Sequence, residues 1–332
     1  MGTYFSWIQR ITENRLTRHK AIKAANAAAK AKKRTFKGEL LGWLDAIVFA
    51  VVLVLIVNQY LFQLFMIPSP SMVSTLEIKD RVFVSKTTYG IELYPGGKKV
   101  FATTTPLRDE VIVFYNPLYI SKGPVFDILS QLIYMASFSL INIDVDEKGN
   151  MKERLYVKRV GATGGETVFF TEGKVSFLSS GQSSPLQEAD LRSARQLSGA
   201  PHQSIDPSMY PAIKAYGSLL AYQEADLSAA APSFLVQQYR PLAEYTALMD
   251  YYEVQKAQSK TSHQINPADI GARLQAGRYE RGIYVPTGYV LPLGDNRDNS
   301  QDGRYFGPVP FKKIIGSVKF RFWPLKRLGI VR

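Results

Sequence analysis

Residues 40–67 read LLGWLDAIVFAVVLVLIVNQYLFQLFMI, and Asp45 is the only charged residue among them. About 20 consecutive apolar residues are enough to cross the hydrocarbon core of a bilayer. Trp43 and Tyr60 lie near the ends of the run, where aromatic residues meet the membrane interface. A buried core helix is the alternative, whereas a cleaved signal peptide would need a shorter charged region before the apolar run. The pattern predicts one transmembrane anchor over residues 40–65.

The chain before this anchor is strongly basic. Residues 1–37 contain ten Lys and Arg residues against a single acid, Glu13, while the whole chain carries a net charge of +13. A basic arm can bind nucleic acid, but Lys- and Arg-rich flanks of a span also stay on the cytoplasmic side. We therefore expect a cytoplasmic arm over residues 1–39, a single-pass anchor in the cytoplasmic (inner) membrane, and a body on the outer side. The expected partner is the lipid bilayer and not nucleic acid.

The composition excludes several classes of protein. With 332 residues, of which 46% are hydrophobic, the chain can form a large core and suggests about two domains. It has no cysteine, which excludes a disulfide scaffold, a cysteine nucleophile and a thiolate zinc site. With only three histidines, a multi-histidine metal site is not expected, and we predict neither a metal nor an organic cofactor.

After the anchor, short runs rich in Val, Ile, Phe and Tyr are bounded by Gly, Pro or Asp, as β-strands are. These runs are Arg81–Thr88, Glu110–Tyr115, Arg154–Val160, Thr167–Phe170, Ile283–Leu291 and Ile314–Trp323. They predict a mainly β fold, with an antiparallel catalytic body formed by residues 66–175 and 282–332. The Ser-, Ala- and Gln-rich residues 176–281 predict a mixed α/β inserted cap region. It includes a helix that begins at Pro241, with an apolar stripe at helical spacing formed by Leu242, Tyr245, Leu248, Met249 and Tyr252.

Three clusters of residues can carry chemistry, and the first follows the anchor directly. It reads Ile67-Pro-Ser-Pro-Ser-Met-Val-Ser-Thr-Leu76. Two prolines stop a helix and stiffen the turn on which Ser69 and Ser71 lie. Such a turn can expose one hydroxyl as a nucleophile and direct the other at a developing oxyanion. A helix stop followed by a polar turn is the alternative interpretation.

The second cluster is Tyr156-Val-Lys-Arg159, and the third is Gly294–Arg304, which reads GDNRDNSQDGR. Lys158 shares a strand face with Tyr156 and Val160, and burial on an apolar face lowers the pKa of a lysine. An edge-strand lysine kept in solvent is the alternative. The alternating acids and arginines of the third cluster indicate an internal hydrogen-bond network rather than a plain surface turn.

Together these clusters resemble type I signal peptidases, the membrane-bound serine proteases that cut signal peptides from exported proteins. Four blocks stand in the family's order: Ser71-Met72, Arg108–Phe114, Tyr156–Arg159 and Gly294–Ser300. The resemblance covers the anchor and the body from about Phe65 to Arg332, with residues 176–281 poorly matched. The family usually has glycine between the two serines, where this chain has Pro70.

The resemblance implies a role for each matched residue. Ser71 corresponds to the nucleophile and Lys158 to the general base, while Ser69 and the Ser71 N–H correspond to the oxyanion donors. Ser300 corresponds to the residue that hydrogen-bonds and orients the lysine, supported by Asp302 and Arg304. The substrate-binding positions, which form small apolar pockets for an Ala-x-Ala sequence, correspond to Phe65, Ile67, Pro68, Met72, Leu76 and Val157.

The implied partners are preprotein signal peptides, with the secretion translocon as a further candidate. The substrate would add as an extended strand beside Phe65–Ser69 and Leu155–Lys158. This geometry bears on a second apolar stretch, Val125–Ile143. If that stretch crossed the bilayer, Ser71 and Lys158 would lie on opposite sides, so we expect an interfacial or core segment held at the membrane surface.

Two other functions compete with this hypothesis. One is a membrane-anchored, catalytically silent binding or assembly protein on the same scaffold. The other is a serine–lysine self-cleaving repressor with a basic DNA-binding arm. The arm leads directly into the apolar run and lacks an apolar pattern of helix-turn-helix size, which disfavours the repressor.

Overall fold

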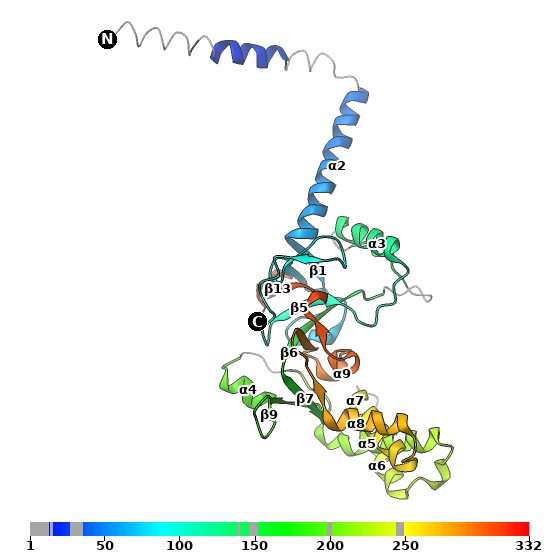
Figure 1. Cartoon of the computed structure of the whole chain (residues 1–332). Coiled ribbons are helices and arrows are strands. Elements are labelled where there is room, and N and C mark those ends of the chain that lie inside the picture. Colours follow the sequence, from blue (N-terminus) through cyan, green and yellow to red (C-terminus); the bar gives the residue numbers. More distant parts are fainter. Residues whose placement is uncertain are drawn as a thin grey trace. The chain divides into compact units, whose positions relative to one another are not determined.

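The computed structural model describes residues 13, 16–26, 36–137, 140–145, 152–197, 201–243 and 249–331. The chain forms two compact units, Met1–Leu55 and Ile56–Arg332. Helix α2 (Phe36–Tyr60) contains most of the apolar run (Figure 1). Its residues Glu39–Tyr60 form the single helix in the described part of the chain that is long and apolar enough to cross a membrane. Most of the predicted basic arm lies outside the described residues, apart from a helix at 16–26.

The helix ends earlier than the predicted anchor, which therefore extends too far at its C-terminal end. Residues Phe62–Met66 form strand β1 instead, paired antiparallel with β2 (Arg81–Ser85). Gln63 and Phe65 point inward from this strand and are buried. Apolar residues suit a helix and a buried strand equally well, and pairing with β2 decides between them.

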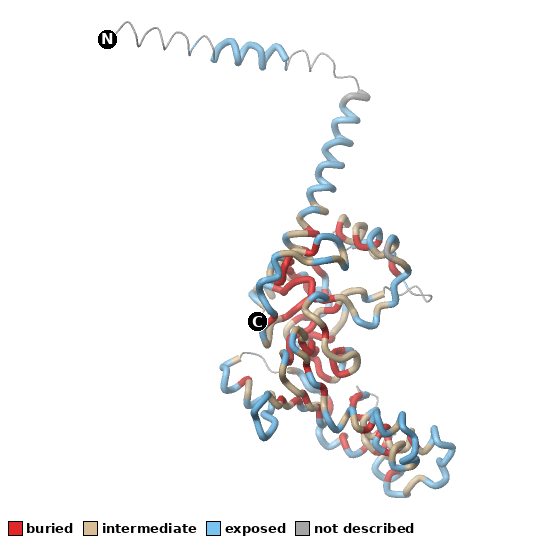
Figure 2. Tube along the Cα trace, viewed as in Figure 1, coloured by how far each residue is buried: buried red, intermediate tan, exposed pale blue. Residues whose placement is uncertain are grey.

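The second unit contains a curled, antiparallel sheet in the order β1-β2-β13-β5-β6-β11-β12, with β14 paired to β13. Its remaining strands are β5 (Val111–Tyr115), β6 (Leu155–Thr163), β11 (Tyr289–Leu293), β12 (Val309–Pro310), β13 (Ile314–Trp323) and β14 (Gly329–Ile330). Many of the buried residues in the described part of the chain lie in these strands and their connections (Figure 2). The mainly β, antiparallel body is therefore confirmed.

A second sheet has the order β10-β7-β8-β9, and a small one pairs β3 with β4. The strands are β7 (Glu166–Thr171), β8 (Lys174–Ser179), β9 (Leu186–Gln187), β10 (Ile283–Tyr284), β3 (Ile91–Glu92) and β4 (Lys99–Val100). Every predicted run contains a strand, but Ile283–Leu291 is divided between β10 and β11. The turn at Pro286–Gly288 separates them, since Gly288 has a positive φ and Tyr289 N–H donates to the carbonyl of Pro286.

Helices dominate the chain between β9 and β10. They are α4 (Glu188–Ala194), α5 (Tyr210–Glu224), α6 (Ser233–Ala243), α7 (Tyr251–Ile265) and α8 (Ile270–Arg281). The prediction that a helix begins at Pro241 is wrong, because Pro241 lies near the end of α6. Of its predicted stripe, Tyr245 and Leu248 lie outside the described residues, and Tyr252 belongs to α7.

The first part of the second apolar stretch, residues 125–136, lies in helix α3 (Pro124–Ala136). Its 13 residues are too few to cross a bilayer as a helix, which needs about 20. Ser130, Gln131 and Met135 are buried on one side, whereas Val125 and Leu129 are exposed. Only the inner side of α3 is therefore part of the core, since Leu140 and Ile141 farther along the predicted stretch are exposed and residues 138–139 lie outside the described residues.

Candidate active site

Ser71 lies in a single 3-10 turn, η1 (Pro70–Met72), directly after the extended residue Ser69. Pro70 occupies the first position of this turn, where a fixed φ and a missing N–H cost nothing. Val73 N–H closes the turn on the carbonyl of Pro70 at 3.1 Å. Pro70 is therefore compatible with the turn that presents the serine.

Lys158 reaches this turn from strand β6. Its Nζ lies 2.5 Å from Ser71 Oγ, although the two residues are 87 positions apart in the sequence. Both are buried, with 3% of Lys158 and 7% of Ser71 exposed. Burial lowers the pKa of the Lys158 ammonium group to about 8, against an opposing effect of the Asp302 carboxylate. About a tenth of this lysine is therefore neutral at pH 7 and able to accept a proton, far more than for an ordinary lysine.

Ser69 supplies a second hydroxyl beside the first. Its Oγ lies 3.4 Å from Ser71 Oγ. A hydroxyl at this distance can turn toward an oxygen atom that develops charge next to Ser71.

The polar run Gly294–Arg304 folds into the internal network that its sequence predicts. Asp302 is fully buried and accepts from Arg304 Nε at 2.9 Å and from Gly294 N–H at 2.9 Å. Burial alone would raise the pKa of Asp302, but Arg304 beside it holds that pKa below its usual value. Arg304 also donates to the carbonyls of Arg297 and Ser300, which fixes the loop around the ion pair.

The predicted hydrogen bond from Ser300 to the lysine is absent. Ser300 Oγ is buried and has no hydrogen-bond partner among the residues that the structure describes. The side chain lies against Gly294, where a Cβ atom would come within 2.1 Å of Ser300 Oγ. Lys158 Nζ bonds to Ser71 instead. Ser300 is thus placed in the site without the contact that was expected of it.

Two residues of the polar run, Asp295 and Asn296, make contacts that the sequence analysis did not predict. Arg159 pairs with Asp295 through two bonds of 2.7 Å, and Thr75 donates to the same carboxylate at 2.6 Å. Asn296 donates its backbone N–H to the carbonyl of Ser71 and its side-chain amide to the carbonyl of Pro70. These contacts join the loop to the serine turn, and the density of polar residues in the run was the available signal.

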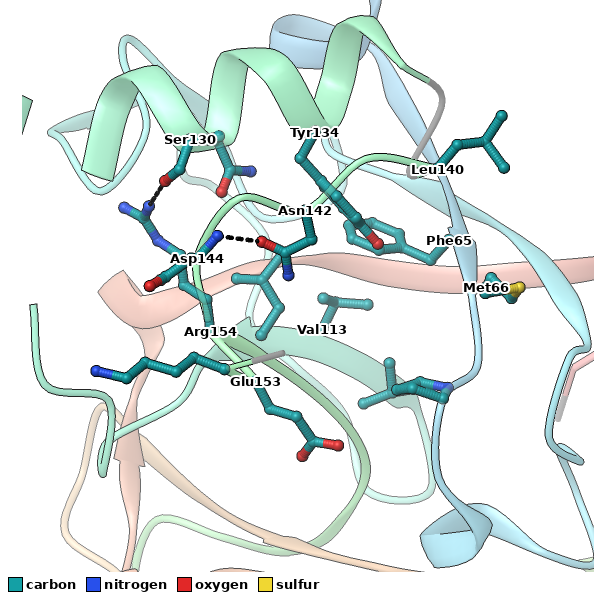
Figure 3. A pocket seen from close by; sticks show the side chains of 15 residues that line it. Phe65, Met66, Val113, Ser130, Tyr134, Leu140, Asn142, Asp144, Glu153 and Arg154 are labelled. Atoms are coloured by element: carbon teal, nitrogen blue, oxygen red, sulfur yellow. Dashed lines mark hydrogen bonds between the residues drawn. The ribbon is translucent and has the colours of Figure 1, made fainter. Parts of the chain in front are cut away.

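The predicted substrate-binding residues also come together. One apolar cluster of the sheet contains Phe65, Ile67, Met72 and Leu76, with Val157 packed at its margin. Phe65 and Val157 also line a cavity of about 360 Å³ together with the sixth residue, Pro68 (Figure 3). Ser71 and Lys158 do not line this cavity, which lies beside them along the strands.

The arrangement suits nucleophilic acyl transfer. A buried amine in contact with a serine hydroxyl can take its proton, and a neighbouring hydroxyl can stabilise the resulting oxyanion. These are the parts of a serine-type hydrolase.

Comparison with known proteins places the chain in a family. A family model described as signal peptidase, peptidase S26, matches residues 40–323. The chain therefore belongs to this family and is a serine-type signal peptidase. This membership favours an enzyme over the silent scaffold and over the self-cleaving repressor.

Two bacterial relatives are similar over most of the chain. Signal peptidase I of Haemophilus influenzae is 26% identical over 276 residues, which cover 82% of this chain and 67% of the relative. Signal peptidase I of Pseudomonas fluorescens is 26% identical over 289 residues, which cover 83% and 71%. A shorter match, to mitochondrial inner membrane protease subunit 1 of Mus musculus, is 49% identical over 49 residues, or 15% of this chain and 30% of the relative.

Proposed function

We propose that this protein removes signal peptides from exported preproteins after Ala-x-Ala-type sites, with Ser71 as nucleophile and Lys158 as general base. The observation that carries the proposal is the 2.5 Å contact between a buried, low-pKa lysine and a serine hydroxyl. Family membership supplies the reaction class, hydrolysis of a peptide bond.

The mechanism follows from the placement of these groups. Neutral Lys158 takes the proton of Ser71 Oγ, which attacks the scissile carbonyl carbon. Ser69 Oγ and the Ser71 N–H stabilise the oxyanion of the tetrahedral intermediate. The protonated lysine gives its proton to the leaving amine, so that an acyl-enzyme remains on Ser71. The same lysine then activates a water molecule that hydrolyses this ester.

The substrate strand would lie between two strand edges. β1 pairs only with β2 among the described residues, so its other edge has no ladder partner there. On β6, pairing with β11 begins at Arg159 and leaves the Leu155–Lys158 edge open on that side. An extended peptide can satisfy both edges by β-augmentation. Small side chains at its −1 and −3 positions would then enter the apolar pockets that include Ile67, Met72 and Val157.

The location follows from the apolar helix and the charge of the arm. In this proposal residues 1–39 are cytoplasmic, residues near 40–60 cross the membrane, and the core of residues 66–175 and 282–332 lies outside with the inserted region 176–281. Ser71 follows the last residue of α2, Tyr60, by eleven positions. The nucleophile is therefore tethered close to the outer membrane surface, where the cleavage region of a preprotein emerges.

The test is cleavage of a purified preprotein by the full-length chain in detergent. The expected product has a new N-terminus directly after Ala-x-Ala, as measured by mass spectrometry. A matched preprotein with Trp in place of the −1 alanine should not be cut there, because the pocket is small. Cleavage at other sites, or equal cleavage of the Trp substrate, would contradict the proposed specificity.

A further inference from the structure

The inserted region reaches the polar run through residues 201–205, which we call the strap. His202 N–H donates to the carbonyl of Asp295 at 2.6 Å, and Arg297 N–H donates to the carbonyl of His202 at 3.0 Å. His202 thereby forms a parallel β-bridge with Asn296, the residue between those two. The strap is therefore bonded to the polar run on both sides of Asn296.

A carboxylate of the polar run provides a second attachment to the strap. Asp298 Oδ2 accepts from the backbone N–H of Ile205 at 2.9 Å and from that of Ser204. The Ile205 side chain is 2% exposed and packs in an apolar cluster of the inserted region that also contains Tyr210 and Ile213. The strap is thus fixed to the core of the inserted helices as well as to the polar run.

Helix α4 of the inserted region holds the same run through an ion pair. The Glu188 carboxylate accepts from Arg297 Nη1 at 2.6 Å and from Nη2 at 2.8 Å. Both side chains are largely buried, with 13% of Glu188 and 3% of Arg297 exposed. A bidentate pair of this kind fixes the orientation of the arginine as well as its distance. Because Arg297 Nε also donates to the carbonyl of Gly294 at 2.9 Å, the pair fixes the shape of the polar run.

The residue between these attachment points contacts the proposed nucleophile. Asn296 donates its backbone N–H to the carbonyl of Ser71 at 3.1 Å and its side-chain amide to the carbonyl of Pro70 at 3.2 Å. Its two neighbours in the chain, Asp295 and Arg297, are the residues that bond to the strap. A continuous series of contacts therefore leads from the inserted region to the turn that presents Ser71.

We propose that the inserted region positions Ser71 for attack, with Glu188 and the strap as the positioning elements. This inference rests on the proposed function and deepens it. Glu188 acts on Ser71 through Arg297 and Asn296 and takes no part in the chemistry itself. A displacement of reacting groups by about 1 Å can lower a rate by about a hundredfold. Loss of the positioning contact should therefore lower kcat, while KM stays close to its original value because the strands that would bind the peptide are unchanged.

The experiment compares Glu188→Gln with the wild type, as full-length proteins in detergent, on a preprotein with an Ala-x-Ala site. Gln keeps the shape of the side chain and removes the charge that pairs with Arg297. We expect kcat, normalised to the folded fraction from circular dichroism, to fall about tenfold, with KM within about threefold. The matched control is Asp190→Asn, which removes a carboxylate that is exposed on the same helix. It should keep kcat within about twofold.

A double variant tests whether Glu188 acts through its arginine partner. Glu188→Gln combined with Arg297→Gln should lose no more than about twofold in kcat beyond Arg297→Gln alone, because the two substitutions interrupt the same link. Independent losses that multiply in the double variant would contradict a shared path from Glu188 to Ser71.

Hydrogen exchange measured by mass spectrometry separates positioning from a general loss of stability. In Glu188→Gln, amides in peptides covering residues 67–76 and 294–300 should exchange faster, while those of β2 and β13 keep the wild-type rate. Unchanged kcat on a preprotein that the wild type cuts after Ala-x-Ala, or faster exchange confined to α4, would overturn the inference alone. Absence of Ala-x-Ala cleavage by the wild type would instead overturn the proposed function.

Discussion

At the scale of single residues, the burial of Lys158 sets the pH range in which the proposed mechanism can operate. Its ammonium group titrates with a pKa of about 8 because burial disfavours the charged form. We therefore expect kcat/KM for preprotein cleavage to rise with pH, with an apparent pKa near 8. Activity at pH 6 should be about a hundredfold below the plateau, since only the neutral amine can accept a proton. A profile without this limb, measured from pH 6 to 10, would contradict Lys158 as the base.

The lowered pKa of Lys158 also makes the free energy of unfolding depend on pH. A lysine whose pKa is raised by a carboxylate partner loses its stabilising effect as the pH rises, whereas the buried Lys158 becomes less destabilising. The folded-state pKa is lowered from 10.5 to about 8, so the unfolded chain binds more protons between these values. The free energy of unfolding should therefore rise with pH across that window. Lys158→Met should remove this contribution, which can be checked by denaturant unfolding at pH 7 and pH 10.

The sequence predicts which residues come together at this candidate site better than it predicts the contacts between them. Ser71, Lys158 and the Asp302–Arg304 pair could be selected because their blocks are distinctive, and the structure brings them together. The expected Ser300 bond to the lysine is not found among the described residues, because Lys158 Nζ bonds to Ser71 Oγ and Ser300 Oγ has no partner there. The role of Asn296 depends on the backbone of a distant turn, which no local pattern specifies.

At the scale of elements, helix α5 approaches α7 closely at a glycine. A Cβ on Gly217 would lie 2.2 Å from the carbonyl oxygen of Val254. Gly217→Ala should therefore destabilise the protein by about 1–3 kcal/mol, because the two helix backbones must separate. The matched control is Gly277→Ala in α8, which meets only the end of the Arg281 side chain at 3.4 Å and gains helix propensity. Denaturant unfolding followed by far-UV circular dichroism compares the two, and equal stability would contradict this packing.

Helices and strands with a clear local sequence pattern could be predicted. Those whose secondary structure depends on pairing with a distant segment could not. The six β-like runs all contain strands, because β-branched and aromatic residues between turn residues favour that state. Residues Phe62–Met66 continue the apolar helix pattern, and only their pairing with β2 makes them a strand. Pro241 suits the first turn of a helix, yet it lies near the end of α6, where the helix is already closing.

At the scale of the whole molecule, the proposed membrane anchor and its orientation can be tested together. The absence of cysteine makes single-cysteine labelling direct. Lys20→Cys in the basic arm should be protected from a membrane-impermeant maleimide in intact cells, and Glu280→Cys in the body should be labelled. After alkaline extraction the protein should remain in the membrane pellet. The reverse labelling pattern would contradict the orientation, and release from the pellet would contradict the anchor.

The central claim is that Ser71 and Lys158 together cut the preprotein, and variant kinetics test it most directly. Full-length Ser71→Ala and Lys158→Met should each lose at least about 10³-fold in kcat for cleavage after Ala-x-Ala. The matched control is Lys86→Met, since Lys86 is a second buried lysine, 2% exposed, whose pKa burial also lowers to about 8. The account predicts that folded Lys86→Met keeps kcat within about threefold of wild type. Cleavage that survives in Ser71→Ala or Lys158→Met would contradict the account.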